Sequence, residues 1–87
     1  MPDAMLAMPR LYFDLHEPGT VTIDEEGREL AGLDVARASA ITDARAVMCD
    51  EVTHGRLCLS CHIDIRDQAG ATVAQVAFAD AVEISGR

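Results

Sequence analysis

Apolar and polar residues alternate in two stretches of the chain, and such alternation predicts strands with one buried face. In residues 10–16, the apolar side chains of Leu11, Phe13 and Leu15 are predicted to share the buried side. The longest alternating stretch covers residues 57–66. Its inward positions are predicted to be Leu57, Leu59, Cys61, Ile63 and Ile65.

Two shorter strands are predicted beside these. A Glu-Pro-Gly turn signal leads into residues 20–23, where Val21 and Ile23 are expected to face inward. An Asp-Gln-Ala-Gly hairpin loop follows the longest strand, and residues 72–78 are predicted to pair with that strand. Residues 82–84 are expected to pack as a short extended tail.

One long helix is predicted between the two pairs of strands, from Leu30 to about Val52. Its apolar positions fall in one stripe that is rich in alanine, and small side chains let a helix lie close to a sheet. Gly32 is the expected N-cap, and His54-Gly55 is expected to end the helix. The stripe comprises Leu33, Ala36, Ala40, Ala44, Val47 and Met48, with Ile41 at its edge. The predicted solvent side carries Ser39, Asp43, Ala46, Cys49 and Asp50.

This order of elements predicts an α+β fold, ββαββ, in which a single long helix packs on one face of a small antiparallel sheet of about four strands. Residues 10–84 are expected to form one domain, with a flexible N-terminal appendage at 1–9 and a tail at 85–87. Both Met1 and Met8 are possible natural starts. The sheet face away from the helix is expected to carry Tyr12, Asp14, His16, Ser60, His62 and Asp64.

Charge and composition narrow the range of partners. The chain has 87 residues and a formal net charge of −8, and its seven basic residues are all arginines without a cluster. A nucleic-acid binder needs a positive footprint, so neither nucleic acid nor an anionic membrane is an expected partner. Aromatic residues make up only 3% of the chain. A chain of 87 residues buries only a thin core, so dimerisation would help to stabilise it.

The sequence carries no recognisable targeting or membrane signal. It has no apolar stretch of about 18 residues, and its first residues have no basic segment followed by an apolar one. A cytoplasmic location is expected. Three cysteines in a reducing compartment then argue against a disulfide framework.

Cys58-Leu59-Ser60-Cys61-His62 is the one segment that spells a known chemistry. C-x-x-C-H is the spacing of c-type haem attachment, and C-x-x-C also occurs in metal and redox sites. Residues three apart on a strand point to opposite faces, so Cys61 would face the core and Cys58 the solvent, and no haem or other cofactor is expected. The alternative is a zinc site in a bent knuckle. Its candidate ligands are Cys58, Cys61 and His62, with Cys49 or His54.

The polar face of the sheet is the second candidate site. If the first and third predicted strands are neighbours, Asp14, His16, His62 and Asp64 lie together, and carboxylates beside imidazoles can bind a metal ion. Together with Tyr12 they also form the expected interaction face, although polar residues on the open side of a sheet are the ordinary arrangement. The acidic turn at residues 24–27 lacks the spacing of a calcium loop and is expected to be solvated.

Several segments together resemble a known family. They are Met8-Pro9-Arg10-Leu11-Tyr12-Phe13-Asp14-Leu15-His16, Asp24-Glu25-Glu26-Gly27-Arg28-Glu29-Leu30, Ala36-Arg37-Ala38-Ser39-Ala40, Asp67-Gln68-Ala69-Gly70 and Phe78-Ala79-Asp80-Ala81-Val82. Over most of residues 8–84 the chain resembles a family of small uncharacterised bacterial proteins, frequent in rhizobia and related alphaproteobacteria. The resemblance favours Met8 as the start and implies no activity. Cysteines at positions 58 and 61 are not characteristic of that family, which weakens the haem interpretation. The order of elements is also loosely similar to HicB-like antitoxin domains.

The leading hypothesis is a small, non-enzymatic, cytoplasmic interaction or regulatory module that forms a homodimer through an exposed edge strand. A metal-binding protein is the alternative, with Cys58, Cys61 and His62 or the polar sheet face as ligands. No Ser-His-Asp order, glycine-rich phosphate loop or catalytic carboxylate pair stands out, so an enzyme is the third hypothesis. Its first sign would be a pocket that holds His16 and His62.

Overall fold

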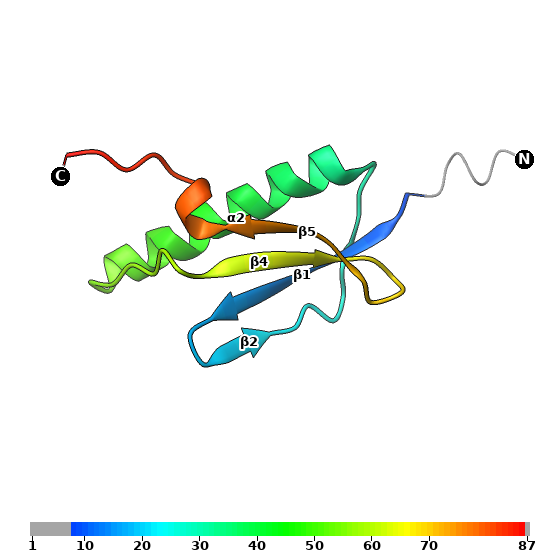
Figure 1. Cartoon of the computed structure of the whole chain (residues 1–87), viewed down its shortest axis with the longest axis horizontal. Helices are drawn as coiled ribbons and strands as arrows, with labels where there is room; N and C mark the ends of the chain where they lie inside the picture. The colour runs from blue at the N-terminus through cyan, green and yellow to red at the C-terminus, as the bar shows by residue number, and fades with distance from the viewer. Residues whose placement is uncertain (1–7, 87) are drawn as a thin grey trace, which may run out of the picture.

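The computed structural model describes residues 8–86, which form an antiparallel sheet with one long helix on one of its faces (Figure 1). The predicted α+β fold is confirmed. Residues 1–7 of the predicted appendage lie outside the described residues. The elements are β1 (Arg10–Glu17), β2 (Thr20–Thr22), β3 (Arg28–Glu29), α2 (Leu33–Thr53), β4 (His62–Arg66), β5 (Thr72–Ala77) and a 3-10 turn, η1 (Phe78–Asp80).

The sheet has the strand order β2-β1-β4-β5, and β3 pairs with the beginning of β1. It has five strands rather than about four because Arg28 and Glu29 pair with Leu11 and Arg10. The first and third predicted strands are neighbours, since β1 and β4 pair directly. In this antiparallel register Asp14 lies opposite Asp64, and His16 lies opposite His62.

The core lies between the sheet and α2, which crosses β4 and β5 (Figure 1). The predicted alanine stripe faces the sheet, and Ala36, Ala40 and Ala44 are fully buried. Small side chains let the helix backbone lie close to the larger strand residues, which fill the space. Those larger core residues are Leu11, Phe13, Ile63, Ile65, Val76 and Phe78.

The helix begins later than predicted and ends where predicted. The Leu30 N–H donates to the carbonyl of Pro9 at 3.0 Å, which extends the pairing of β3 with β1 and keeps Leu30 out of the helix. Gly32 is the N-cap, as expected, and its carbonyl accepts from the Ala36 N–H. Leu33 is exposed rather than part of the buried stripe, because it starts the helix at its outer end.

The inward positions predicted for the second strand are wrong. Val21 and Ile23 are both about half exposed, at 48% and 54%. Strand β2 lies on the far side of β1, whereas α2 contacts β4 and β5, so the helix does not cover this edge (Figure 1). Alternation in such a short segment therefore does not identify a buried face.

The longest predicted strand is shorter than expected, because β4 begins only at His62. Residues 59–60 form a bend, and Leu57 and Leu59 are exposed rather than inward. The bend brings residues three apart to the same side, so Cys58 and Cys61 form a disulfide. The prediction that their sulfurs face opposite sides is wrong, and so is the prediction that these cysteines stay unpaired.

Among the described residues, no helix combines the length and the apolar character that crossing a membrane requires.

Candidate metal centre

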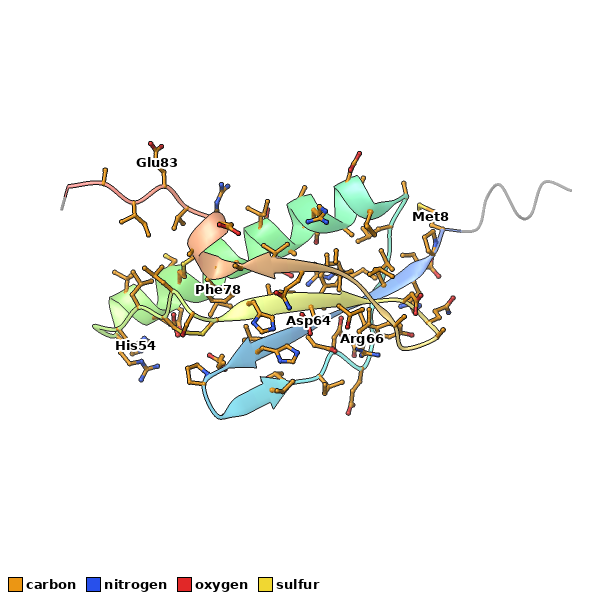
Figure 2. All side chains as sticks on the ribbon, viewed as in Figure 1. Met8, His54, Asp64, Arg66, Phe78 and Glu83 are labelled. Atoms are coloured by element: carbon orange, nitrogen blue, oxygen red, sulfur yellow. A yellow bond between two sulfur atoms is a disulfide. The ribbon has the colours of Figure 1, made fainter. Side chains whose placement is uncertain are left out.

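Polar side chains on the open face of the sheet fall into two adjacent clusters along β1 and β4. Figure 2 labels Asp64 and Arg66, which project from β4 on the side away from α2. The histidine cluster consists of His16, His62 and Asp64. The arginine cluster consists of Asp14, Asp24 and Arg66.

The histidine cluster is built by strand register. His16 and His62 are direct cross-strand partners, and their rings stack with centroids 4.5 Å apart and an interplanar angle of 12°. Asp64 lies two residues beyond His62, on the same face. Its Oδ2 atom is 3.1 Å from Nε2 of His16, and its Oδ1 atom is 3.4 Å from Nε2 of His62. Each residue therefore offers a ligand atom, and the three ligand atoms lie within 4.8 Å of one another.

The cluster is partly open to solvent and is supported from the next strand. The histidine side chains are 30% exposed and that of Asp64 is 17% exposed. Gln75, the register partner of Asp64 on β5, donates from Nε2 to Oδ1 of Asp64 at 2.8 Å. This bond restrains the carboxylate and leaves lone pairs that face the imidazoles. Two imidazoles and one carboxylate form a set that zinc, copper, nickel and iron all accept.

The arginine cluster is closed by its own hydrogen bonds. Asp14 is only 2% exposed. Its carboxylate accepts from the Arg66 guanidinium through both oxygens and from the Asp24 N–H at 2.9 Å. The prediction that Asp14 joins the two histidines in one site is therefore wrong. The loop before β3 covers Asp14, and the Arg66 guanidinium donates hydrogen bonds to both oxygens of the Asp14 carboxylate.

The acidic turn at residues 24–27 is structural rather than solvated throughout. Asp24 is half-buried, and its carboxylate accepts from the N–H groups of Phe13, Glu26 and Gly27 at 3.0–3.1 Å. Gly27 has a φ of 72°, which a residue with a Cβ adopts only at a cost. A Cβ there would also lie 2.9 Å from the Tyr12 ring. The turn thus holds β3 against β1.

Both carboxyl groups of the arginine cluster have lowered pKa values. Burial opposes the ionisation of Asp14, but hydrogen bonds from Arg66 and the Asp24 N–H outweigh it and lower the pKa. Burial likewise opposes the ionisation of Asp24, and bonds from the Gly27, Phe13 and Glu26 N–H groups lower its pKa. The hydrogen bond to Asp14 in turn raises the pKa of Arg66. Asp14 and Arg66 therefore stay charged as an ion pair, and Asp24 stays charged beside its backbone donors.

Comparison with known proteins identifies a family without assigning a role. A family model described as a domain of unknown function, DUF6894, matches residues 10–79. The chain belongs to the DUF6894 family. Neither the curated proteins nor the solved structures contain a match to it. The resemblance to an uncharacterised family is thus confirmed for the DUF6894 domain, whereas an alphaproteobacterial origin and a likeness to HicB-like antitoxins stay predictions.

The other predicted ligand set of the DUF6894 domain does not come together. Cys58 and Cys61 are joined as a disulfide, and Cys61 is buried in the core. His62 starts β4 and faces the open side of the sheet, away from that core. Cys49 is free and exposed on α2, as expected, and His54 caps the same helix. The sulfur-rich zinc knuckle is therefore not formed.

The predicted interaction face of the DUF6894 domain is only partly accessible. Asp14 is buried, and Tyr12 is half-buried with the Arg66 guanidinium 5.1 Å from its ring centroid. Ser60, which was predicted on the same side of the sheet but not in the interaction face, lies in the bend before β4, and its hydroxyl is 3.4 Å from the Cys58 sulfur. The accessible part of this face is the histidine cluster.

Sequence reasoning missed Gln75, Asp24 and Arg66 as partners of the predicted residues. Gln75 was identifiable in principle, because a hairpin between β4 and β5 places a β5 polar residue beside Asp64. Asp24 carries a recognisable signal as well, since an aspartate three residues before a glycine often caps a turn. Arg66 occupies the same sheet face as Asp14, but its pairing depends on the loop that covers both.

Proposed function

We propose that this DUF6894 domain binds a divalent transition-metal ion through His16, His62 and Asp64. The observation that carries the proposal is the short distance between the ligand atoms. The three residues each offer one ligand atom, and these atoms lie within 4.8 Å of one another on a partly open sheet face. Three protein ligands leave a coordination position for water or for a group from a partner. The net charge of −8 favours the approach of a cation.

Stable support from the fold strengthens the proposal. Two of the ligands lie on β4 and the third lies opposite on β1, so strand pairing and not a loop fixes their spacing. Gln75 restrains Asp64 from a third strand. Outer partners of this kind hold metal ligands in position, and losing one typically costs about 10- to 100-fold in affinity.

The test is a titration of the full chain, purified without chelator or added histidine tag, with Zn²⁺ in a calorimeter. We expect one ion per chain. His16→Ala and His62→Ala should each weaken binding by about 100-fold or more, because each removes one of three ligands. His54→Ala is the matched control, since His54 lies at the exposed end of α2, outside the cluster.

Equal losses in all three histidine variants would contradict the proposal, and so would a wild-type chain that takes up no stoichiometric Zn²⁺, Ni²⁺ or Cu²⁺. Binding that persists in both cluster variants would place the ion elsewhere. Circular dichroism of each variant separates lost binding from lost folding.

We also propose self-association through the edge of β5, because a specific feature favours it. Within residues 8–86, β5 pairs with β4 on one side only. Its sequence, Thr-Val-Ala-Gln-Val-Ala, contains neither charge nor proline, the two devices that usually protect an edge strand. Because β5 carries no charged side chain, antiparallel pairing of two β5 strands would place no like charges directly opposite each other. A non-enzymatic, cytoplasmic role for such a dimer stays a prediction.

Light scattering over a wide range of protein concentration tests the dimer. Val73 is 38% exposed on β5, so Val73→Lys should shift the chain to monomer by placing charge at the pairing edge. Val21→Lys on β2, at the opposite edge, is the control and should leave the dimer intact. A wild-type chain that is monomeric at every concentration would rule out this second role.

A further inference from the structure

The Cys58–Cys61 disulfide closes the turn between α2 and β4, and its two sulfurs differ in accessibility. Cys58 is half-buried, whereas Cys61 is 1% exposed and belongs to the core. A thiol from outside can therefore approach Cys58 and not Cys61. This asymmetry assigns separate roles to the two sulfurs in any exchange reaction, because access decides which sulfur is attacked.

The backbone of both cysteines is held independently of the sulfur–sulfur bond. The Cys58 N–H donates to Oε1 of Glu51 at 3.2 Å, and Glu51 is a buried residue of α2. The Arg56 N–H donates to the Glu51 carbonyl at 2.8 Å. The Cys61 carbonyl accepts from the Phe78 N–H at 2.9 Å. Breaking the disulfide removes none of these bonds, so the reduced turn is expected to keep its shape.

A stabilising role explains little of this disulfide. Only Leu59 and Ser60 lie between the two cysteines, and the chain-entropy contribution of a cross-link decreases as the closed loop becomes shorter. Leu57 and Leu59 expose apolar surface beside the accessible sulfur, at 52% and 36%. Such surface can contact a second protein while its thiol reaches Cys58.

We propose that Cys58 and Cys61 form a thiol–disulfide exchange site whose co-reactant is a dithiol, and that Cys58 is the sulfur attacked. The first thiolate of the dithiol forms a bond to Sγ of Cys58, the Cys58–Cys61 bond breaks, and Cys61 leaves as a thiolate that takes a proton. The second thiol of the co-reactant, as a thiolate, then attacks the co-reactant's sulfur in the mixed disulfide. Cys58 leaves as a thiolate and takes a proton. Two electrons pass to the protein, which becomes a dithiol, and the co-reactant becomes a disulfide.

Exchange is tested in chains that all carry Cys49→Ser, because Cys49 is free and exposed and would otherwise react. The folded Cys49→Ser chain is equilibrated with buffers of reduced and oxidised dithiothreitol, and its free thiols are counted by alkylation and mass spectrometry. We expect reversible, two-thiol reduction without denaturant, and unchanged circular dichroism in the reduced form.

Single-cysteine variants test which sulfur reacts. With oxidised glutathione as the probe, the Cys61→Ser chain should form a mixed disulfide at Cys58 about tenfold faster or more than the Cys58→Ser chain forms one at Cys61, because Cys61 is buried. A disulfide that is reduced only in denaturant would overturn the proposal. So would equal reactivity of the two single-cysteine chains while both remain folded, or loss of folding on reduction.

Discussion

The histidine cluster and the arginine cluster occupy the same face of the same two strands, yet they differ in how their polar atoms are used. Asp14 and Asp64 are direct register partners on β1 and β4. The Asp14 carboxylate accepts bonds at both oxygens from Arg66 and from a backbone N–H. Asp64 has one such donor, Gln75, and otherwise faces two imidazoles. A carboxylate whose oxygens are both hydrogen-bonded stabilises the fold. A carboxylate with few hydrogen bonds, beside imidazoles, keeps lone pairs that can bind a metal ion.

The cause of the difference is the loop before β3. Its Asp24 N–H donates to Asp14, and its Asp24 carbonyl accepts from Arg66 at 3.4 Å, so the loop shields the Asp14 carboxylate from water. At the other end of the strands, where His16 pairs with His62, none of the described residues provides such a cover, and the histidine side chains are 30% exposed. Burial therefore makes Asp14 a structural carboxylate and leaves its register partner Asp64 a candidate ligand, although no sequence signal distinguishes the two.

The largest expected effect concerns the response to zinc. At a free Zn²⁺ concentration of about 100 times Kd, binding to the native chain raises the free energy of unfolding by about 2.7 kcal/mol. We expect Asp64→Asn to lose most of this stabilisation, because a neutral amide is a poorer ligand than a carboxylate. Asp14→Asn should retain it. Thermal unfolding with and without Zn²⁺ measures both, and a folded Asp14→Asn chain without a zinc response would remove the distinction between the clusters.

Without metal, the order of the same two variants should reverse. Asp14→Asn leaves the Arg66 guanidinium and the Asp24 N–H with a weaker, partly mismatched acceptor. We expect it to lower the free energy of unfolding by about 1–3 kcal/mol, the range for losing the partner of a buried polar group. Asp64→Asn should stay within about 0.5 kcal/mol of the wild type, as for most partly exposed positions. Urea unfolding in the presence of chelator compares them directly.

Acid should weaken the fold through the arginine cluster. The pKa values of Asp14 and Asp24 lie below the ordinary value of 3.8 in the folded chain. As the pH falls, these two carboxylates therefore bind protons in the unfolded chain before they do so in the folded chain. The contribution of the ionised Asp14 and Asp24 to stability is complete above pH 3.8 and is lost as the pH falls through their folded-state pKa values. Unfolding curves measured at successive pH values should show a shallower acid loss in Asp14→Asn than in the wild type. An equally steep loss would assign acid sensitivity to other carboxyl groups.

Much of the fold was predictable because it depends on repeating patterns. Strand β1 buries Leu11 and Phe13 as predicted, and the helix stripe buries Ala36, Ala40 and Ala44 as predicted. Leu57 and Leu59 follow the same alternation as Ile63 and Ile65, but no strand or helix of residues 8–86 buries them. Alternation reports a possible face and not the presence of a partner, so the start of β4 could not be located from the sequence.

The candidate site was predictable only in part. The proximity of His16, His62 and Asp64 follows from the pairing of β1 with β4. The alternation predicted both strands but not that they are neighbours. Asp14 is not part of that group because a loop folds back over the sheet and covers it. A contact of this kind leaves no periodic pattern in the sequence. The disulfide at Cys58 was missed for a related reason: residues three apart meet only if the backbone bends, and the apolar alternation favoured a straight strand.

The loop that closes the arginine cluster can be tested with a pair of glycines. Gly27 and Gly19 have similar positive φ values, 72° and 75°. A Cβ on Gly27 would lie 3.0 Å from the Leu11 carbonyl, whereas one on Gly19 would meet no described atom within 4 Å. Gly19→Ala should cost about 1 kcal/mol from backbone conformation, and Gly27→Ala about 2 kcal/mol because contact is added. Equal costs in urea unfolding would show that the loop yields without disturbing β1.

The smallest expected effect is at Gln75, where the histidine cluster receives its only bond from β5 among the described residues. Its Nε2 donates to Asp64 at 2.8 Å, so Gln75→Ala frees the carboxylate to rotate without removing a ligand. Because Gln75 is exposed, we expect a loss of Zn²⁺ affinity of at most about tenfold, or 1.4 kcal/mol, and little change in stability without metal. Gln68→Ala, in the hairpin loop, controls for loss of a surface glutamine. Calorimetry that finds Gln75→Ala as damaging as Asp64→Asn would mean that Gln75 itself binds the ion, and the site would then extend across three strands.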